Sequence, residues 1–89
     1  MNCYRYIISG YVQGVCYRSG AQHAARKLNI TGYAKNLPSG DVEVVARGAE
    51  ADIEEFEKWL WRGPIIADVI DIKKQRIEEN TGFRGFVTY

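Results

Sequence analysis

The sequence has little of what several classes of protein require. It contains two cysteines, Cys3 and Cys16, and one histidine, His23, which are too few for a disulfide scaffold or a zinc site. No apolar run approaches the ~20 residues of a membrane span. The first ten residues lack the basic start and long apolar core of a signal peptide. We therefore expect reduced thiols and a cytoplasmic protein that does not enter a membrane.

The sequence also has no excess of charge of either sign. Twelve Lys and Arg residues face eleven Asp and Glu residues, for a net charge of +1. That charge is too small to suggest nucleic acid as the main partner. The apolar content of 46% is ordinary for a globular protein, and a chain of 89 residues supports one core. We expect residues 1–89 to form a single domain and to act as a monomer.

Hydrophobic periodicity predicts the order of the secondary structure. Alternating apolar and polar residues predict strands, whereas apolar residues at i, i+3, i+4 and i+7 predict helices. The predicted strands cover residues 3–12, 31–36, 41–48, about 67–72 and 83–89, and the predicted helices cover residues 21–28 and about 51–61. Pro38 and Gly40 predict a hairpin turn, and Asp52 with Glu55 resembles a helix N-cap. A charged connection, residues 73–82, precedes the last strand.

This order is that of the ferredoxin-like fold. The fold class is α+β, an α/β sandwich of the order β-α-β-β-α-β plus a short terminal strand. Two helices then pack on one face of an antiparallel sheet. The fold alone does not indicate a function, because it serves RNA-binding proteins, metal chaperones and enzymes.

The connection between the first strand and the first helix has features of an anion site. It reads SGYVQGVCYRSG, residues 9–20. A loop that leads into a helix N-terminus presents unpaired N–H groups and the positive end of the helix dipole. Gly10 and Gly14 permit a close approach of the backbone, and Arg18 has a planar fork of donors that suits phosphate oxygens. From these residues alone, a phosphate site and an arginine that only balances surface charge both remain open.

Two long motifs resemble the signatures of the acylphosphatase family. ISGYVQGVCYR, residues 8–18, is similar to the first signature, and GYAKNLPSGDVEVVARG, residues 32–48, is similar to the second. Weaker similarity extends through residues 56–64 and 85–89, so the resemblance covers nearly the whole chain. It implies hydrolysis of the carboxyl–phosphate bond of small acyl phosphates to carboxylate and inorganic phosphate, without a metal or an organic cofactor.

The resemblance also implies which residues form the site. The phosphate-binding arginine of the family corresponds to Arg18, and its water-positioning asparagine corresponds to Asn36. The loop residues that would bind phosphate through the main chain are Gln13, Gly14, Val15, Cys16 and Tyr17. Tyr17 stands where the family usually has Phe or Met. We expect this change to alter packing or add a hydroxyl contact, with the chemistry unchanged.

Two residues of the motifs have other interpretations. Cys16 could act as a nucleophile, but cysteine-based phosphatases place five residues between the nucleophile and the arginine. Here only Tyr17 separates Cys16 from Arg18, so we expect Cys16 to be a small buried apolar residue. Asn36 could be a turn residue, because asparagine favours turns and LPSG follows it.

The main alternative function is a binding module without catalysis, for RNA or protein. Six tyrosines could stack on bases. The third predicted strand, VEVVARG, however, lacks the aromatic motif of RNA-recognition domains. A third possibility is a regulatory or carbamoyl-transfer module of a larger enzyme. Such modules are fused to other domains, so for a chain of 89 residues we expect the separate hydrolase.

Overall fold

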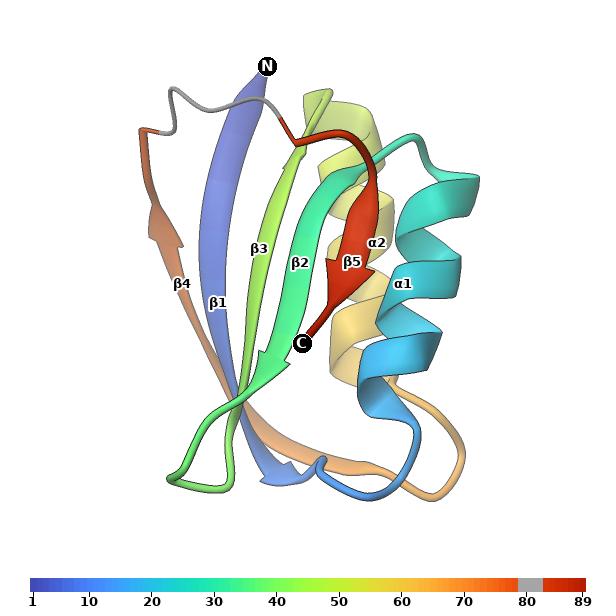
Figure 1. The fold of residues 1–89 in the computed structure, drawn as a ribbon, viewed down its shortest axis with the longest axis vertical. Helices are drawn as coiled ribbons and strands as arrows, with labels where there is room; N and C mark the ends of the chain where they lie inside the picture. Colours follow the sequence, from blue (N-terminus) through green and yellow to red (C-terminus); the bar gives the residue numbers. More distant parts are fainter. Residues whose placement is uncertain (79–82) are drawn as a thin grey trace.

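The computed structural model describes residues 1–78 and 83–89. Its elements in chain order are β1 (Asn2–Tyr11), α1 (Tyr17–Lys27), β2 (Thr31–Asn36), β3 (Val42–Gly48), α2 (Glu50–Arg62), β4 (Asp68–Arg76) and β5 (Phe86–Thr88). Figure 1 shows these elements as one sheet with both helices behind it. The predicted order of elements and the α+β ferredoxin-like fold are confirmed.

The five strands form one sheet in the order β4-β1-β3-β2-β5. Every neighbouring pair is antiparallel except β2 and β5, which run parallel. The prediction of an antiparallel sheet is therefore wrong at this edge. The last two strands of the chain lie at opposite edges, so no hairpin links them and their sequence proximity does not set the direction of β5.

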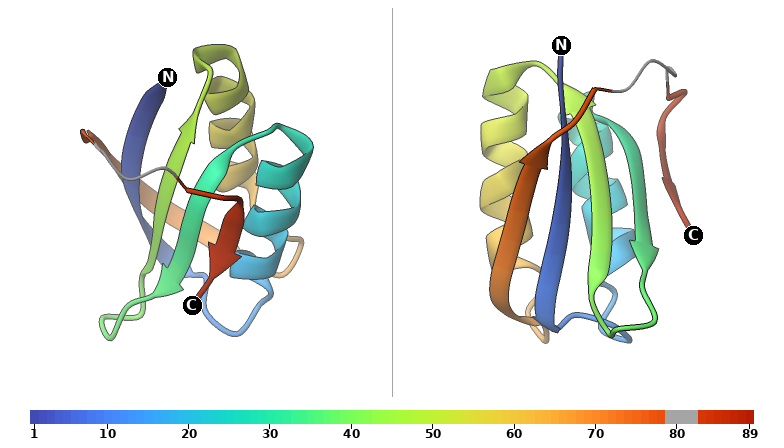
Figure 2. Two further views of the ribbon diagram at one scale, coloured as in Figure 1. Left: turned by 45° about the horizontal axis from the view of Figure 1, so that its top comes forward. Right: turned by 90° about the vertical axis from the view of Figure 1, so that its left-hand side faces the viewer.

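Both helices cover the same face of the sheet, as predicted, and the main core lies between them and the strands (Figure 2). The residues that α1 buries are Tyr17, Ala21 and Ala25, and those that α2 buries are Ile53, Phe56 and Leu60. Full burial of a side chain such as Phe56 contributes about 1.5–3 kcal/mol to the free energy of unfolding. Among the described residues, no helix is long and apolar enough to cross a membrane.

The edge strand β4 is longer than the sequence predicted. It continues through residues 73–76, three of which are charged, and these residues pair with β1. An edge strand tolerates charged side chains because one side of it faces solvent. Lys74 is held there by Glu57 of α2, with Nζ 2.6 Å from Oε2, and by the ring of Tyr4, whose centroid is 4.2 Å away. Residues 79–82 of the predicted charged connection lie outside the described part of the chain.

The predicted cap of α2 is also wrong. The N-cap residue is Ala49, and Asp52 lies inside the first turn of the helix. No side-chain hydrogen bond caps this helix within the described residues. Glu50 and Asp52 instead place negative charge in the first turn, where it interacts favourably with the positive end of the helix dipole.

Candidate active site

The loop between β1 and α1 follows an irregular end of the first strand. The pairing of β1 with β4 shifts register between Ser9 and Gly10. Gly10 has a φ of 124°, and a Cβ at this position would lie 2.1 Å from the main-chain oxygen of Asp68. Gly14 and Cys16 also have positive φ angles, of 76° and 64°. These positions turn the chain from the end of β1 into the start of α1.

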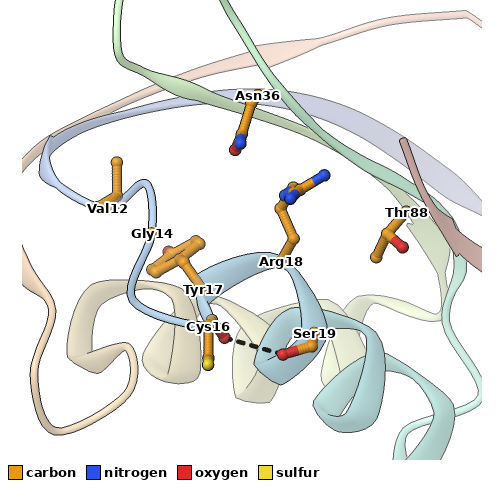
Figure 3. Close-up of a pocket in the computed structure, with 8 residues that line it drawn as sticks. All are labelled: Val12, Gly14, Cys16, Tyr17, Arg18, Ser19, Asn36 and Thr88. Atoms are coloured by element: carbon orange, nitrogen blue, oxygen red, sulfur yellow. Dashed lines mark hydrogen bonds between the residues drawn. The ribbon is translucent and has the colours of Figure 1, made fainter.

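Arg18 lies in the first turn of α1, directly after this loop, and is half-buried. Its Nη1 donates a hydrogen bond to the main-chain oxygen of Tyr89, which follows β5. Figure 3 shows the arginine side chain rising from the helix toward Asn36. The guanidinium therefore lies in the space between α1, β2 and the end of β5.

Asn36 is the last residue of β2 and pairs with Val42 of β3 in the predicted hairpin. Its Oδ1 is buried and has no hydrogen-bond partner among the residues that the structure describes. A buried acceptor without a partner costs about 1–3 kcal/mol, and a donor that reached this oxygen would remove that cost. In Figure 3 the side chain of Asn36 points toward Arg18.

A pocket of about 400 Å³ brings these groups together. Arg18 and Asn36 line it, together with three further residues that the sequence predicted for the site: Gly14, Cys16 and Tyr17. The lining residues that the sequence analysis missed are Val12, Ser19 and Thr88. Val12 and Ser19 adjoin the motif, which could have indicated them. Thr88 belongs to β5, and no sequence signal links it to the loop.

Gln13 and Val15, the other two predicted site residues, are not among the residues that line this pocket. Val15 is only 1% exposed and belongs to the hydrophobic core. The side chain of Gln13 faces the β2–β3 turn, where its Nε2 donates to the main-chain oxygens of Leu37 and Asp41, both at 2.9 Å. The side chain of Val15 thus anchors the loop in the core, and that of Gln13 anchors it to the β2–β3 turn.

The prediction that Cys16 is buried is wrong, because its side chain is exposed. Cys16 is the N-cap residue of α1 and has a left-handed backbone conformation. Its main-chain oxygen accepts hydrogen bonds from the N–H of Gly20, at 3.1 Å, and from Oγ of Ser19, at 3.2 Å. In Figure 3 the sulfur points away from Arg18, so it is not directed at a group bound beside the guanidinium.

Tyr17 makes the additional hydroxyl contact that the sequence predicted. Its hydroxyl donates to the main-chain oxygen of Leu60 in α2, at 2.6 Å. Its ring lies 5.3 Å from the ring of Trp59, centroid to centroid, and the side chain is 1% exposed. Burial raises the pKa of the Tyr17 phenol, which therefore donates in its neutral form. This contact fixes the start of α1 against the end of α2.

A metal ion would need several ligating side chains close together, in the pocket or elsewhere in the described structure. Within residues 1–78 and 83–89, no group of three or more His, Cys, Asp and Glu side chains is arranged to hold a metal ion. His23 is exposed on α1.

Comparisons with known proteins agree with the resemblance in the sequence motifs. The sequence pattern that defines the acylphosphatase family matches residues 4–88. An acylphosphatase of Vibrio vulnificus (strain CMCP6) is 48% identical over 85 residues, which cover 93% of this chain and 94% of the relative. The crystal structure of an acylphosphatase from Bacillus subtilis has a TM-score of 0.95 and 32% identity, and the match covers 100% of this chain and 99% of that one.

A second solved structure, of an acylphosphatase from Coxiella burnetii, has a TM-score of 0.92 and 36% identity, covering 99% of this chain and 92% of that one. The similarity thus extends over nearly the full length of this chain, of the Vibrio vulnificus relative and of both solved structures. The chain belongs to the acylphosphatase family.

Proposed function

We propose that this pocket hydrolyses the carboxyl–phosphate bond of a small acyl phosphate by in-line attack of water on phosphorus. Arg18 binds the phosphoryl group and Asn36 orients the water. One observation carries the proposal: the side chains of Arg18 and Asn36 point toward each other in one pocket, and the buried Oδ1 of Asn36 has no hydrogen-bond partner within the described part of the chain. The first group suits an anion, and the second suits a donor such as water.

Arg18 acts on the charge that the reaction develops. Phosphoryl transfer passes through a loose transition state with negative charge on three equatorial oxygens, so catalysis is mainly positioning and electrostatic stabilisation. A guanidinium has five N–H donors, and the bond to Tyr89 uses one of them. Within the described residues the side chain makes no other hydrogen bond, so its remaining donors can reach phosphoryl oxygens. The main-chain N–H groups of the loop complete the proposed phosphate site, and they belong to Gln13, Gly14, Val15, Cys16 and Tyr17.

Asn36 acts on the nucleophile. Its Oδ1 accepts a hydrogen bond from water and thereby aims a lone pair of the water at phosphorus. An amide is too weak a base to remove the proton. As the new P–O bond forms, the bond to the acyl oxygen breaks and its electron pair leaves with the carboxylate. The water proton passes to a phosphoryl oxygen, which gives inorganic phosphate.

The substrate, the cofactor and partners, the oligomeric state and the location in the cell belong to the same proposal. We propose a small-molecule acyl phosphate as substrate and no cofactor, metal or nucleic acid as partner. We further propose that residues 1–89 act as one domain, as a monomer in the cytoplasm. The net charge of +1 supports a small ligand over a polyanion, because nothing in the overall charge concentrates nucleic acid at the surface.

Hydrolysis of an aromatic acyl phosphate in ¹⁸O-labelled water, with and without EDTA, tests the proposal. We expect turnover in both conditions and the label in inorganic phosphate, since the water attacks phosphorus. Label in the carboxylate would show attack on carbon and contradict the role of Asn36. Turnover that EDTA abolishes would contradict the absence of a metal. No turnover by the folded protein would favour the non-enzymatic binding module.

A further inference from the structure

We infer that Gln13 is a positioning residue that holds Asn36 at the distance from the phosphate-binding loop that the reaction needs. This inference rests on the proposed function, because it assigns a role relative to the water-orienting side chain. It differs from the main-chain contribution to phosphate binding proposed above, since it concerns the side-chain amide of Gln13.

The Gln13 amide spans two parts of the chain. Gln13 is half-buried, and its Nε2 donates at 2.9 Å to the main-chain oxygen of Leu37 and at 2.9 Å to that of Asp41. A carboxamide nitrogen has two N–H donors, so both are used. Leu37 and Asp41 are themselves joined, because the N–H of Leu37 donates to the oxygen of Asp41 at 2.9 Å. One side chain therefore holds both ends of a single turn.

This turn is the one that carries Asn36. Leu37 directly follows Asn36, and Asp41 directly precedes Val42, the residue that pairs with Asn36. The two acceptors of Gln13 thus flank the last residue pair of the β2–β3 hairpin. A displacement of the turn relative to the loop would move the Asn36 carboxamide with it.

The sheet provides no direct link in place of Gln13. In the order of the described strands, β3 lies between β1 and β2, so no main-chain ladder among them joins the loop after β1 directly to the end of β2. On either side of Gln13 in the chain, Val12 and Gly14 line the pocket. The glutamine therefore connects the wall that carries the phosphate-binding loop to the wall that carries Asn36.

Two substitutions of Gln13 test this role. Gln13→Glu keeps the length and shape of the side chain but removes both N–H donors, and Gln13→Ala removes the side chain. We expect kcat to fall by about 10- to 100-fold in each, since a displacement of about 1 Å can cost 10²-fold. In Gln13→Ala the inhibition constant of inorganic phosphate should change by less than about threefold, because Arg18 and the loop amides remain. Gln13→Glu also adds a negative charge beside the anion site, so it should in addition weaken phosphate inhibition.

Gln22→Ala is the matched control. The Nε2 of Gln22 also donates to a main-chain oxygen, that of Phe86 at 2.8 Å, but it joins α1 to β5 and not to the turn. We expect its kcat to stay near that of the unsubstituted protein. Amide NMR spectra check that each variant is folded. If Gln13→Ala is unfolded, Gln13→Asn, which keeps the amide and loses one methylene, takes its place with a smaller expected loss of kcat.

A double-substitution cycle with Asn36→Ala separates positioning from general support. If Gln13 acts through Asn36, Gln13→Ala should lower kcat by less than about twofold more once Asn36 is absent. An equal loss in both backgrounds would overturn the inference, as would an unchanged kcat in folded Gln13 variants. If Asn36→Ala alone leaves kcat unchanged, it is the proposed function that fails, whatever the Gln13 variants do.

Discussion

The guanidinium of Arg18 donates a hydrogen bond to the main-chain oxygen of Tyr89, and this bond joins the first turn of α1 to the residue that follows β5. Tyr89 is itself held by the sheet. Its N–H donates to the oxygen of Ala34 at 2.9 Å, and its ring lies 5.5 Å from that of Tyr33. Because the arginine is already oriented before an anion arrives, less side-chain entropy is lost on binding.

Arg18→Ala is expected to lower kcat/KM for a small acyl phosphate by at least about 10³, as removal of phosphate-binding arginines does. Inorganic phosphate should inhibit the unsubstituted protein competitively and lose this effect in the variant. Arg26→Ala, which removes an exposed arginine from the last turn of the same helix, is the control and should remain active. Near-normal rates in a folded Arg18→Ala protein would refute the role of this residue.

Asn36→Ala is expected to lower kcat by about 10²-fold while phosphate inhibition changes little, because the residue positions water and not the anion. The fold should lose less than about 1 kcal/mol, since Oδ1 has no partner to lose within the described part of the chain. Steady-state kinetics and thermal unfolding measure both. A turn residue without a catalytic role would give the opposite result, with a lower stability and an unchanged kcat.

Cys16→Ser is expected to retain most of the activity, because the sulfur is exposed and directed away from Arg18. Cys16→Gly should in addition stabilise the fold by up to about 1 kcal/mol, since glycine adopts the left-handed backbone at this position without a steric penalty. Kinetics and chemical denaturation test the pair. Complete loss of hydrolysis in a folded Cys16→Ser protein would point to covalent catalysis by the thiol.

Tyr17→Phe is expected to cost about 1–2 kcal/mol of stability, because the main-chain oxygen of Leu60 loses a buried donor. Tyr11→Phe is the control: Tyr11 is 63% exposed, and the substitution should leave the melting temperature unchanged. The kcat of folded Tyr17→Phe should fall far less than that of Arg18→Ala. A large loss of kcat without a loss of stability would mean that the hydroxyl takes part in the reaction.

The order of the elements, the buried side of α2 and the approximate place of the candidate site were predictable from the sequence, whereas the start of α1 at Tyr17 and the burial of that residue were not. Periodicity is a local property, so Ile53, Phe56 and Leu60 predict the buried side of α2 before any tertiary contact is known. The two long motifs predicted Arg18 and Asn36 through their resemblance to the family signatures, and the structure brings both into one pocket.

Features that depend on contacts between distant segments could not be predicted from the sequence. The parallel pairing of β5 brings Thr88 to the pocket and Tyr89 to Arg18, and no local pattern specifies which strand β5 joins. The left-handed turn at Cys16 exposes a thiol that its residue type predicts to be buried. The two hydrogen-bond partners of Gln13 follow from the packing of the loop against the turn. The sequence does not indicate them, because the acceptors are main-chain oxygens, which every residue has.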